Sequence, residues 1–264
     1  MSQASIRRDD LVWAAALTLP LLARLHAEGL DAALQRLLLL GAVAIVVHAW
    51  AWLFARTAQR PLGSGLPAFA LGFVLLLPGP VGWGGALLAV SFGAVFGREI
   101  FGGRALLPPA LIALVFAVYS FPDGGFEARQ VLTLTPDPVF TLACLAGAAL
   151  GLVLRGTLAW QVAAGALAGA LLAGGLTAGG DGWAHLARGN FAAGVLFLAA
   201  APESAASGRG AQWLHGLLVG VLAVVIRLAD PEAPDGVVFA VLLGALFAPL
   251  IDRALGWRPR LDPA

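Results

Sequence analysis

The chain has 264 residues, of which 60% are hydrophobic and 12% charged, and its formal net charge is +1 at pH 7. A soluble domain usually carries about 25% charged residues, so the composition excludes an ordinary soluble globule and predicts a protein that crosses the membrane several times. The balanced charge gives no basic surface for nucleic acid, and the single cysteine, Cys144, excludes an internal disulfide.

Apolar segments recur along the whole chain and predict a helix for each crossing. A helix needs roughly 20 apolar residues to span a bilayer, and fewer where it breaks inside the protein. Several segments are short and interrupted by glycine or proline, which is typical of broken helices. The predicted spans are residues 11–25, 33–55, 64–79, 82–97, 106–121, 138–155, 158–178, 187–202, 212–228 and 236–255. We therefore expect an all-α polytopic membrane protein with about ten transmembrane helices.

The distribution of arginine predicts the orientation of these spans. All sixteen basic residues are arginine, and most fall in the loops on the side that carries both termini. Because cytoplasmic loops are enriched in basic residues, we expect both termini in the cytoplasm and the chain in the bacterial inner membrane. The polar start MSQASIRRDD indicates a cytoplasmic segment rather than a cleaved signal peptide.

The two halves of the chain resemble each other. The segment FALGFVLLLPGP (Phe69–Pro80) aligns with FAAGVLFLAAAP (Phe191–Pro202), and a tryptophan and then an arginine follow each copy. Five spans per copy would turn the second copy upside down, which is the inverted-repeat plan. We expect one repeat at residues 1–121, a short outer loop at 122–137, the inverted repeat at 138–255 and a cytoplasmic tail at 256–264. The alternative is a chance alignment of Gly, Ala and Leu.

Each predicted repeat contains a break rich in glycine and proline. The first break contains Gly97, Gly102, Gly103 and Pro108, and the second contains Asp235 and Gly236. Glycine permits close backbone approach, and proline at a helix start loses no hydrogen bond. We expect these six residues to line a polar slot where broken helix ends meet. The alternatives are helix termination alone and ordinary surface loops.

Four motifs carry a resemblance to a known family. They are GREIFGG (Gly97–Gly103), PPA (Pro108–Ala110), PDGVVFA (Pro234–Ala240) and FAPLIDR (Phe247–Arg253). The chain resembles the RnfD/NqrB family, the large membrane subunits of ion-pumping Rnf and Nqr redox complexes. The resemblance implies ten helices in two inverted halves, partner subunits that contain flavin and iron–sulfur centres, and electron transfer across the membrane, with or without coupled ion translocation.

One family motif is missing from the sequence. The family attaches FMN to the last threonine of a Ser/Thr-Gly-Ala-Thr motif in the loop after span five, and residues 122–137 lack this motif. Thr135 is the nearest remnant, and we do not expect covalent FMN there. The resemblance leaves a non-covalent flavin, riboflavin or FMN, as the expected cofactor, held by the six break residues.

Few other residues suggest chemistry. His48 and His215 lie in predicted spans, where hydrogen bonding to a neighbour is the default role and haem ligation the alternative. Asp252 and Arg253 are expected to form an ion pair at the interface. The sequence shows no catalytic residues and no cluster of metal ligands, so we expect no turnover from the isolated chain. The alternative functions are a small-solute channel or transporter and a cofactor-free structural anchor.

Overall fold

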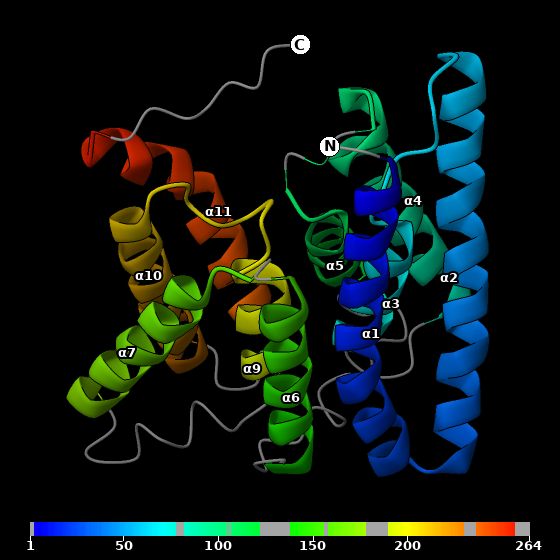
Figure 1. Ribbon diagram of the computed structural model, residues 1–264. Helices are drawn as coiled ribbons and strands as arrows, with labels where there is room; N and C mark the ends of the chain where they lie inside the picture. The colour runs from blue at the N-terminus through cyan, green and yellow to red at the C-terminus, as the bar shows by residue number, and fades with distance from the viewer. Residues whose placement is uncertain are drawn as a thin grey trace.

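The computed structural model describes residues 3–77, 82–103, 105, 107–121, 138–155, 158–177, 190–229 and 236–256, with side chains from Asp10 onward except that of Arg155. The regular elements of these residues are helical (Figure 1). They are α1 (Gln3–Glu28), α2 (Leu30–Thr57), α3 (Leu66–Leu76), α4 (Trp83–Gly97), the 3-10 turn η1 (Glu99–Phe101), α5 (Pro109–Ser120), α6 (Pro138–Arg155), α7 (Trp160–Thr177), α9 (Phe191–Gly194), its π-helical continuation η4 (Val195–Ala199), α10 (Arg209–Ala229) and α11 (Gly236–Ala254).

The predicted all-α polytopic membrane fold is confirmed. Each of the ten predicted spans coincides with a helical segment, and α9 with η4 makes up the eighth. Among the described residues, six helical segments are long and apolar enough to cross a membrane, and α3, α5 and most of α6 are shorter apolar helices. The short helices are the ones that need protein around their ends, because lipid cannot satisfy free backbone groups.

Proline and glycine set the boundaries of the short helices. Pro109 is the first residue of α5, where a missing N–H costs nothing, and Pro67 lies in the first turn of α3. Between α4 and α5, Gly102 and Gly103 have φ angles of 73° and 80°, in the left-handed region that favours glycine. The motif GREIFGG therefore ends one helix and turns the chain toward the next.

The helix contacts in the second half repeat those in the first. Helix α1 contacts α3, α2 contacts α4, and α4 contacts α5; α6 contacts α9, α7 contacts α10, and α10 contacts α11. Across the halves, α1 contacts α6 and α5 contacts α11. Figure 1 shows α1 descending and α6 ascending. This pattern supports two inverted copies of one unit, and the boundaries of the repeats stay a prediction.

Helices α7 and α10 approach each other through four glycines. A Cβ atom on Gly165 would lie 2.6 Å from the carbonyl oxygen of Trp213, and a Cβ on Gly169 would overlap the carbonyl of Leu217. Gly216 and Gly220 face the backbone of α7 equally closely. Small residues let helix backbones pack directly, which is a main source of helix association in membranes.

A buried polar cluster satisfies the carboxyl end of α3. Arg24 donates to the carbonyl oxygen of Leu75 at 2.5 Å and to Oδ1 of Asn190 at 3.0 Å. Asn190 donates to the carbonyl of Leu76 at 2.9 Å. Arg36 donates to the carbonyl of Val74 at 2.7 Å. Positive charge at this end also matches the helix dipole, so α3 can end inside the protein.

Glu28 partly balances the positive charges of this cluster. Its carboxylate lies 3.2 Å from Nε of Arg24 and 2.5 Å from a terminal nitrogen of Arg36. The two arginine residues are 6% and 7% exposed, and an unpaired charge with so little access to water would be strongly destabilising. Through Asn190, which precedes α9, the cluster also joins the first half of the chain to the second.

Candidate functional site

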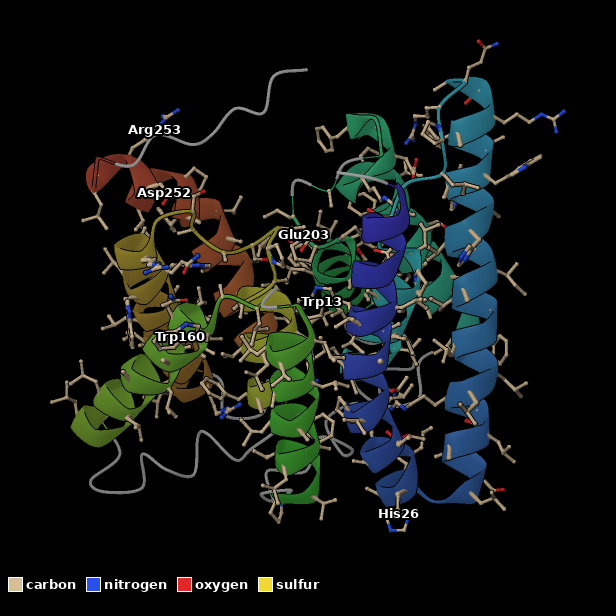
Figure 2. All side chains as sticks on the ribbon, viewed as in Figure 1. Trp13, His26, Trp160, Glu203, Asp252 and Arg253 are labelled. Atoms are coloured by element: carbon tan, nitrogen blue, oxygen red, sulfur yellow. The ribbon has the colours of Figure 1, made fainter. Side chains whose placement is uncertain are left out.

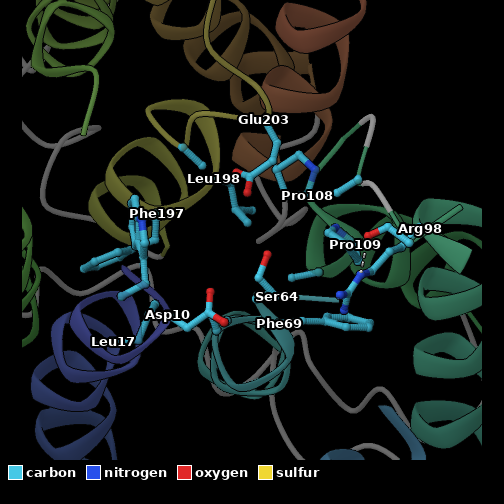
Figure 3. A pocket seen from close by; sticks show the side chains of 18 residues that line it. Asp10, Leu17, Ser64, Phe69, Arg98, Pro108, Pro109, Phe197, Leu198 and Glu203 are labelled. Atoms are coloured by element: carbon cyan, nitrogen blue, oxygen red, sulfur yellow. Dashed lines mark hydrogen bonds between the residues drawn. The ribbon is translucent and has the colours of Figure 1, made fainter. Parts of the chain in front are cut away.

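A cavity of about 430 Å³ lies between the first half of the chain and the segment around η4 (Figure 3). This volume falls in the range of about 300–1,000 Å³ that is typical of small-molecule sites. Its lining comes from segments that are far apart in sequence: Asp10, Trp13, Leu17, Ser64, Gly65, Ala68, Phe69, Gly72, Arg98, Gly103, Ala105, Pro108, Pro109, Ala110, Phe197, Leu198, Ala201 and Glu203.

Aromatic side chains form one part of this lining. Trp13 of α1 and Phe197 of η4 meet edge to face, with ring centroids 6.3 Å apart and an interplanar angle of 73°. Phe69 of α3 is 3% exposed and lines the cavity from the first half. Large apolar rings of this kind suit a flat hydrophobic ligand.

Arg98 supplies positive charge to the lining. Its side chain is almost fully buried, and Figure 3 shows it reaching toward Phe69. Nε donates to the carbonyl oxygen of Gly103 at 3.2 Å and lies 3.8 Å from the carboxylate of Glu99. Arg60 also binds the Glu99 carboxylate, so two arginines share one acid. The group therefore keeps a net positive charge beside the cavity.

Two helices begin at the cavity and add to its positive potential. The first turns of α3 and α5 contribute Gly65, Ala68, Pro109 and Ala110 to the lining. Neither helix has a side-chain hydrogen bond at its amino end. The partial positive charge of a helix amino end favours an electron-rich group nearby.

Two carboxylates give the opposite side of the cavity negative charge. Asp10 comes from α1, and Glu203 follows η4. In Figure 3, Asp10 lies to the left of Ser64 and Glu203 above it, whereas Arg98 lies to the right. The Glu203 side chain keeps an exposed surface, yet the protein around it removes enough water to raise the pKa of this carboxyl, and the charge of Asp10 raises it further. The cavity is thus positive on one side and negative on the other.

The structure brings two of the six predicted site residues to the cavity. Gly103 and Pro108 line it, whereas Gly97 packs against the next helix, because a Cβ there would lie 3.2 Å from Cα of Pro109. Gly102 forms the turn after η1. The roles of all four in binding a ligand stay predictions.

The second predicted break does not contribute to this lining among the described residues. Gly236 is the first residue of α11 and packs against Ile226 of α10. Asp235 and Thr135 lie outside the described residues. The first break meets η4 at this cavity, and a slot shared by the two breaks stays a prediction.

Sequence reasoning missed most of the residues that line the cavity. Arg98 belongs to GREIFGG, but its position in the sequence indicates only the orientation of the spans and the alignment of the repeats, and Phe69 indicates only the alignment. Asp10, Trp13 and Glu203 show no motif. A signal existed only for Arg98, as a charged residue in a turn between two apolar spans.

The other residues singled out in the sequence are His48, His215 and Asp252, and none of them lines the cavity. Nδ1 of His48 pairs with the carbonyl oxygen of Ala44 at 2.7 Å, on an exposed face of α2. His215 is fully buried on α10, and neither ring nitrogen has a hydrogen-bond partner among the described residues, so the expected hydrogen bond to a neighbour is absent there. Asp252, expected to pair with Arg253, instead accepts hydrogen bonds from the backbone N–H groups of Ser207 and Gly208 at 2.9–3.1 Å. It therefore fixes the start of α10 to the end of α11, whose positions Figure 2 shows.

Comparison with known proteins identifies the family. Residues 137–259 match the NQR2, RnfD, RnfE family. The chain is similar to the NqrB subunit of the Na(+)-translocating NADH-quinone reductase of Azotobacter vinelandii, with 31% identity over 259 aligned residues. The chain is a member of the NqrB/RnfD family. The corresponding subunits from Klebsiella pneumoniae strain 342 and Pseudomonas paraeruginosa are 31% and 30% identical to it.

The alignments cover most of this NqrB/RnfD family member but only part of its relatives. They include 79% or 80% of this chain and 64% of each of these relatives. The chain thus spans about 64% of the length of the curated relatives it matches. Membership confirms the resemblance carried by GREIFGG and FAPLIDR, and the membrane-length helices agree with a multi-pass membrane protein.

Proposed function

We propose that this chain serves in an Nqr-like or Rnf-like complex that moves electrons across the bacterial inner membrane, with both termini in the cytoplasm. Its relatives are named as subunits of an NADH-quinone reductase that translocates Na⁺. The expected partners are other membrane subunits and peripheral subunits that carry flavin and iron–sulfur centres.

We further propose that the cavity between α1, α3 and η4 holds a non-covalent flavin, riboflavin or FMN. The single observation that carries this proposal is the combination of aromatic walls with polar groups in one cavity of about 430 Å³. Trp13, Phe69 and Phe197 provide surfaces for a flat ring, and Arg98 and Ser64 provide hydrogen-bond donors. A bound flavin would supply one-electron steps, which no side chain in this lining can supply.

The residues of the chain have separate tasks in this proposal. The aromatic side chains exclude water and hold the ring, and Arg98 faces its electron-rich edge. Glu203, whose pKa is raised chiefly by loss of water around its carboxyl, lines the same cavity. The buried cluster of Arg24, Arg36, Glu28 and Asn190 holds α3, and through it Phe69, in place.

The test is purification of the intact complex in mild detergent. Mass spectrometry should identify redox partner subunits, and the absorbance spectrum should show flavin. Acid precipitation should then release yellow, fluorescent flavin into the supernatant. Fluorescence that stays with the precipitated chain would contradict non-covalent binding, and a complex without redox partners would contradict the proposed function itself.

A further inference from the structure

We propose that Arg98 sets the reduction potential of the ring bound in the cavity, because its fixed positive charge faces the edge that gains negative charge on reduction. This inference rests on the proposed function, since it requires a redox ring in the cavity. A positive charge in a poorly solvated site favours the more negative, reduced form of a ring and so raises its reduction potential.

The surroundings of Arg98 hold its charge in a defined position. The side chain is 3% exposed, and Nε is bound to the carbonyl of Gly103. Glu99 cannot neutralise Arg98 fully, because its carboxylate also pairs with Arg60 and lies 3.8 Å from Nε. The guanidinium therefore keeps part of its positive charge unbalanced beside the cavity.

One terminal nitrogen of Arg98 has no hydrogen-bond partner among the residues that the structure describes. Nη2 is buried and unpartnered, which is costly for a charged donor. It packs against Cα of Gly63, and a Cβ at that position would overlap it. The glycine thus leaves space for the guanidinium at the wall of the cavity. Because Gly63 is not among the residues that line the cavity, this nitrogen lies behind the wall, where no described acceptor offsets its share of the positive charge.

The opposite charges in the cavity would also orient the ring. Asp10 and Glu203 line the other side, where added electron density is disfavoured. The amino ends of α3 and α5 reinforce the positive side. The carbonyl-bearing edge of the ring should therefore face Arg98, and its electron-poor substituents should face the carboxylates. Removing charges from the two sides should shift the potential in opposite directions.

The test is spectroelectrochemical titration of the flavin in the purified complex. In R98Q, the preference of the site for reduced over oxidised ring should fall about tenfold, the order expected for one charge-assisted hydrogen bond. This change lowers a one-electron potential by about 59 mV. R98K keeps the positive charge, so its reduction potential should lie between those of R98Q and the wild type. E203Q removes a negative charge and should raise the reduction potential.

A second variant covers the case in which R98Q does not fold. Gly63→Ala keeps every charge but displaces the guanidinium, so it should also lower the potential. Gly41→Ala, at an open position of α2, is the matched control and should leave the potential unchanged. An unchanged potential in R98Q and Gly63→Ala with flavin still bound would overturn the role of Arg98 and leave the proposed function standing. A wild-type complex without flavin would instead overturn the proposed function.

Discussion

Glu203 is the residue whose ionisation links the cavity to the stability of the fold. Its pKa is raised first by loss of water around the carboxyl and then by the charge of Asp10. A raised pKa means that the folded state holds this proton more tightly than the unfolded state. Folding should therefore lose stability as pH rises from the ordinary carboxyl pKa of 4.5 through the higher pKa of the folded protein.

Replacing Glu203 by glutamine should remove this loss. We expect E203Q to melt at the same temperature as the wild type near pH 4 and at a higher temperature near pH 8. The measurement is the thermal melting temperature of both proteins in detergent across this range. Asp31→Asn is the control, because Asp31 is exposed in the first turn of α2 and its charge should be favourable there. A lower melting temperature of E203Q than of the wild type at pH 8 would contradict the raised pKa of Glu203 in the folded protein.

At this scale, the sequence predicts backbone roles better than ligand contacts. Pro109 and the two glycines of GREIFGG act locally, so their roles in ending and starting helices follow from residue type. The placement of the Arg98 guanidinium beside the cavity could not be predicted in the same way. It depends on Gly63 and Gly103, which only the tertiary fold places against the guanidinium.

The packing of α7 against α10 is the clearest interaction between elements. A Cβ on Gly169 would overlap the carbonyl oxygen of Leu217, whereas Gly175 on the same helix faces open space. We expect Gly169→Ala to lower the free energy of unfolding by about 1–3 kcal/mol, as overpacking usually does. Gly175→Ala should have little effect or stabilise slightly. Urea or thermal unfolding in detergent measures both, and equal effects of the two variants would contradict direct backbone contact.

The helices could be predicted because each needs only local information. Apolar length with glycine and proline boundaries located all ten segments, including the short eighth one at α9 and η4. The partners of these helices could not be predicted in the same way. The sequence predicts that the first break, at GREIFGG, meets the second break at Gly236, and this stays a prediction. The cavity between the first break and η4 had no signal in the sequence, because contacts between halves depend on the relative placement of whole units.

The junction between the halves contains buried hydrogen bonds at one place and the cavity at another. In the predicted repeat alignment, Leu75 and Leu76 correspond to Phe197 and Leu198. Arg24 and Asn190 hold the carbonyls of the first pair, whereas the second pair lines the cavity. Hydrogen bonds of Arg24 and Asn190 therefore join the two halves at one place, and the cavity leaves room for a ligand at the other.

The hydrogen bonds of Asn190 to Arg24 and to the Leu76 carbonyl should stabilise the packing of one half against the other. Asn190→Ala removes the donor to the Leu76 carbonyl and an acceptor of Arg24, all of them buried. We expect a loss of about 1–3 kcal/mol in the free energy of unfolding, the usual cost of unpaired buried polar groups. Thermal melting of the purified protein measures this loss. Asn190→Asp keeps the acceptor for Arg24 and should therefore melt at a higher temperature than the alanine variant. Identical melting of Asn190→Ala and wild type would contradict a stabilising role of these hydrogen bonds.

We propose that the space between α1, α3 and η4 holds a redox ring. The most direct measurement is a cryo-electron microscopy map of the complete complex, at a resolution that shows flat ring density. We predict such density against Trp13, Phe69 and Phe197, with its polar edge toward Arg98. A map with lipid or side chains filling this cavity, and with every flavin of the complex bound elsewhere, would contradict the account.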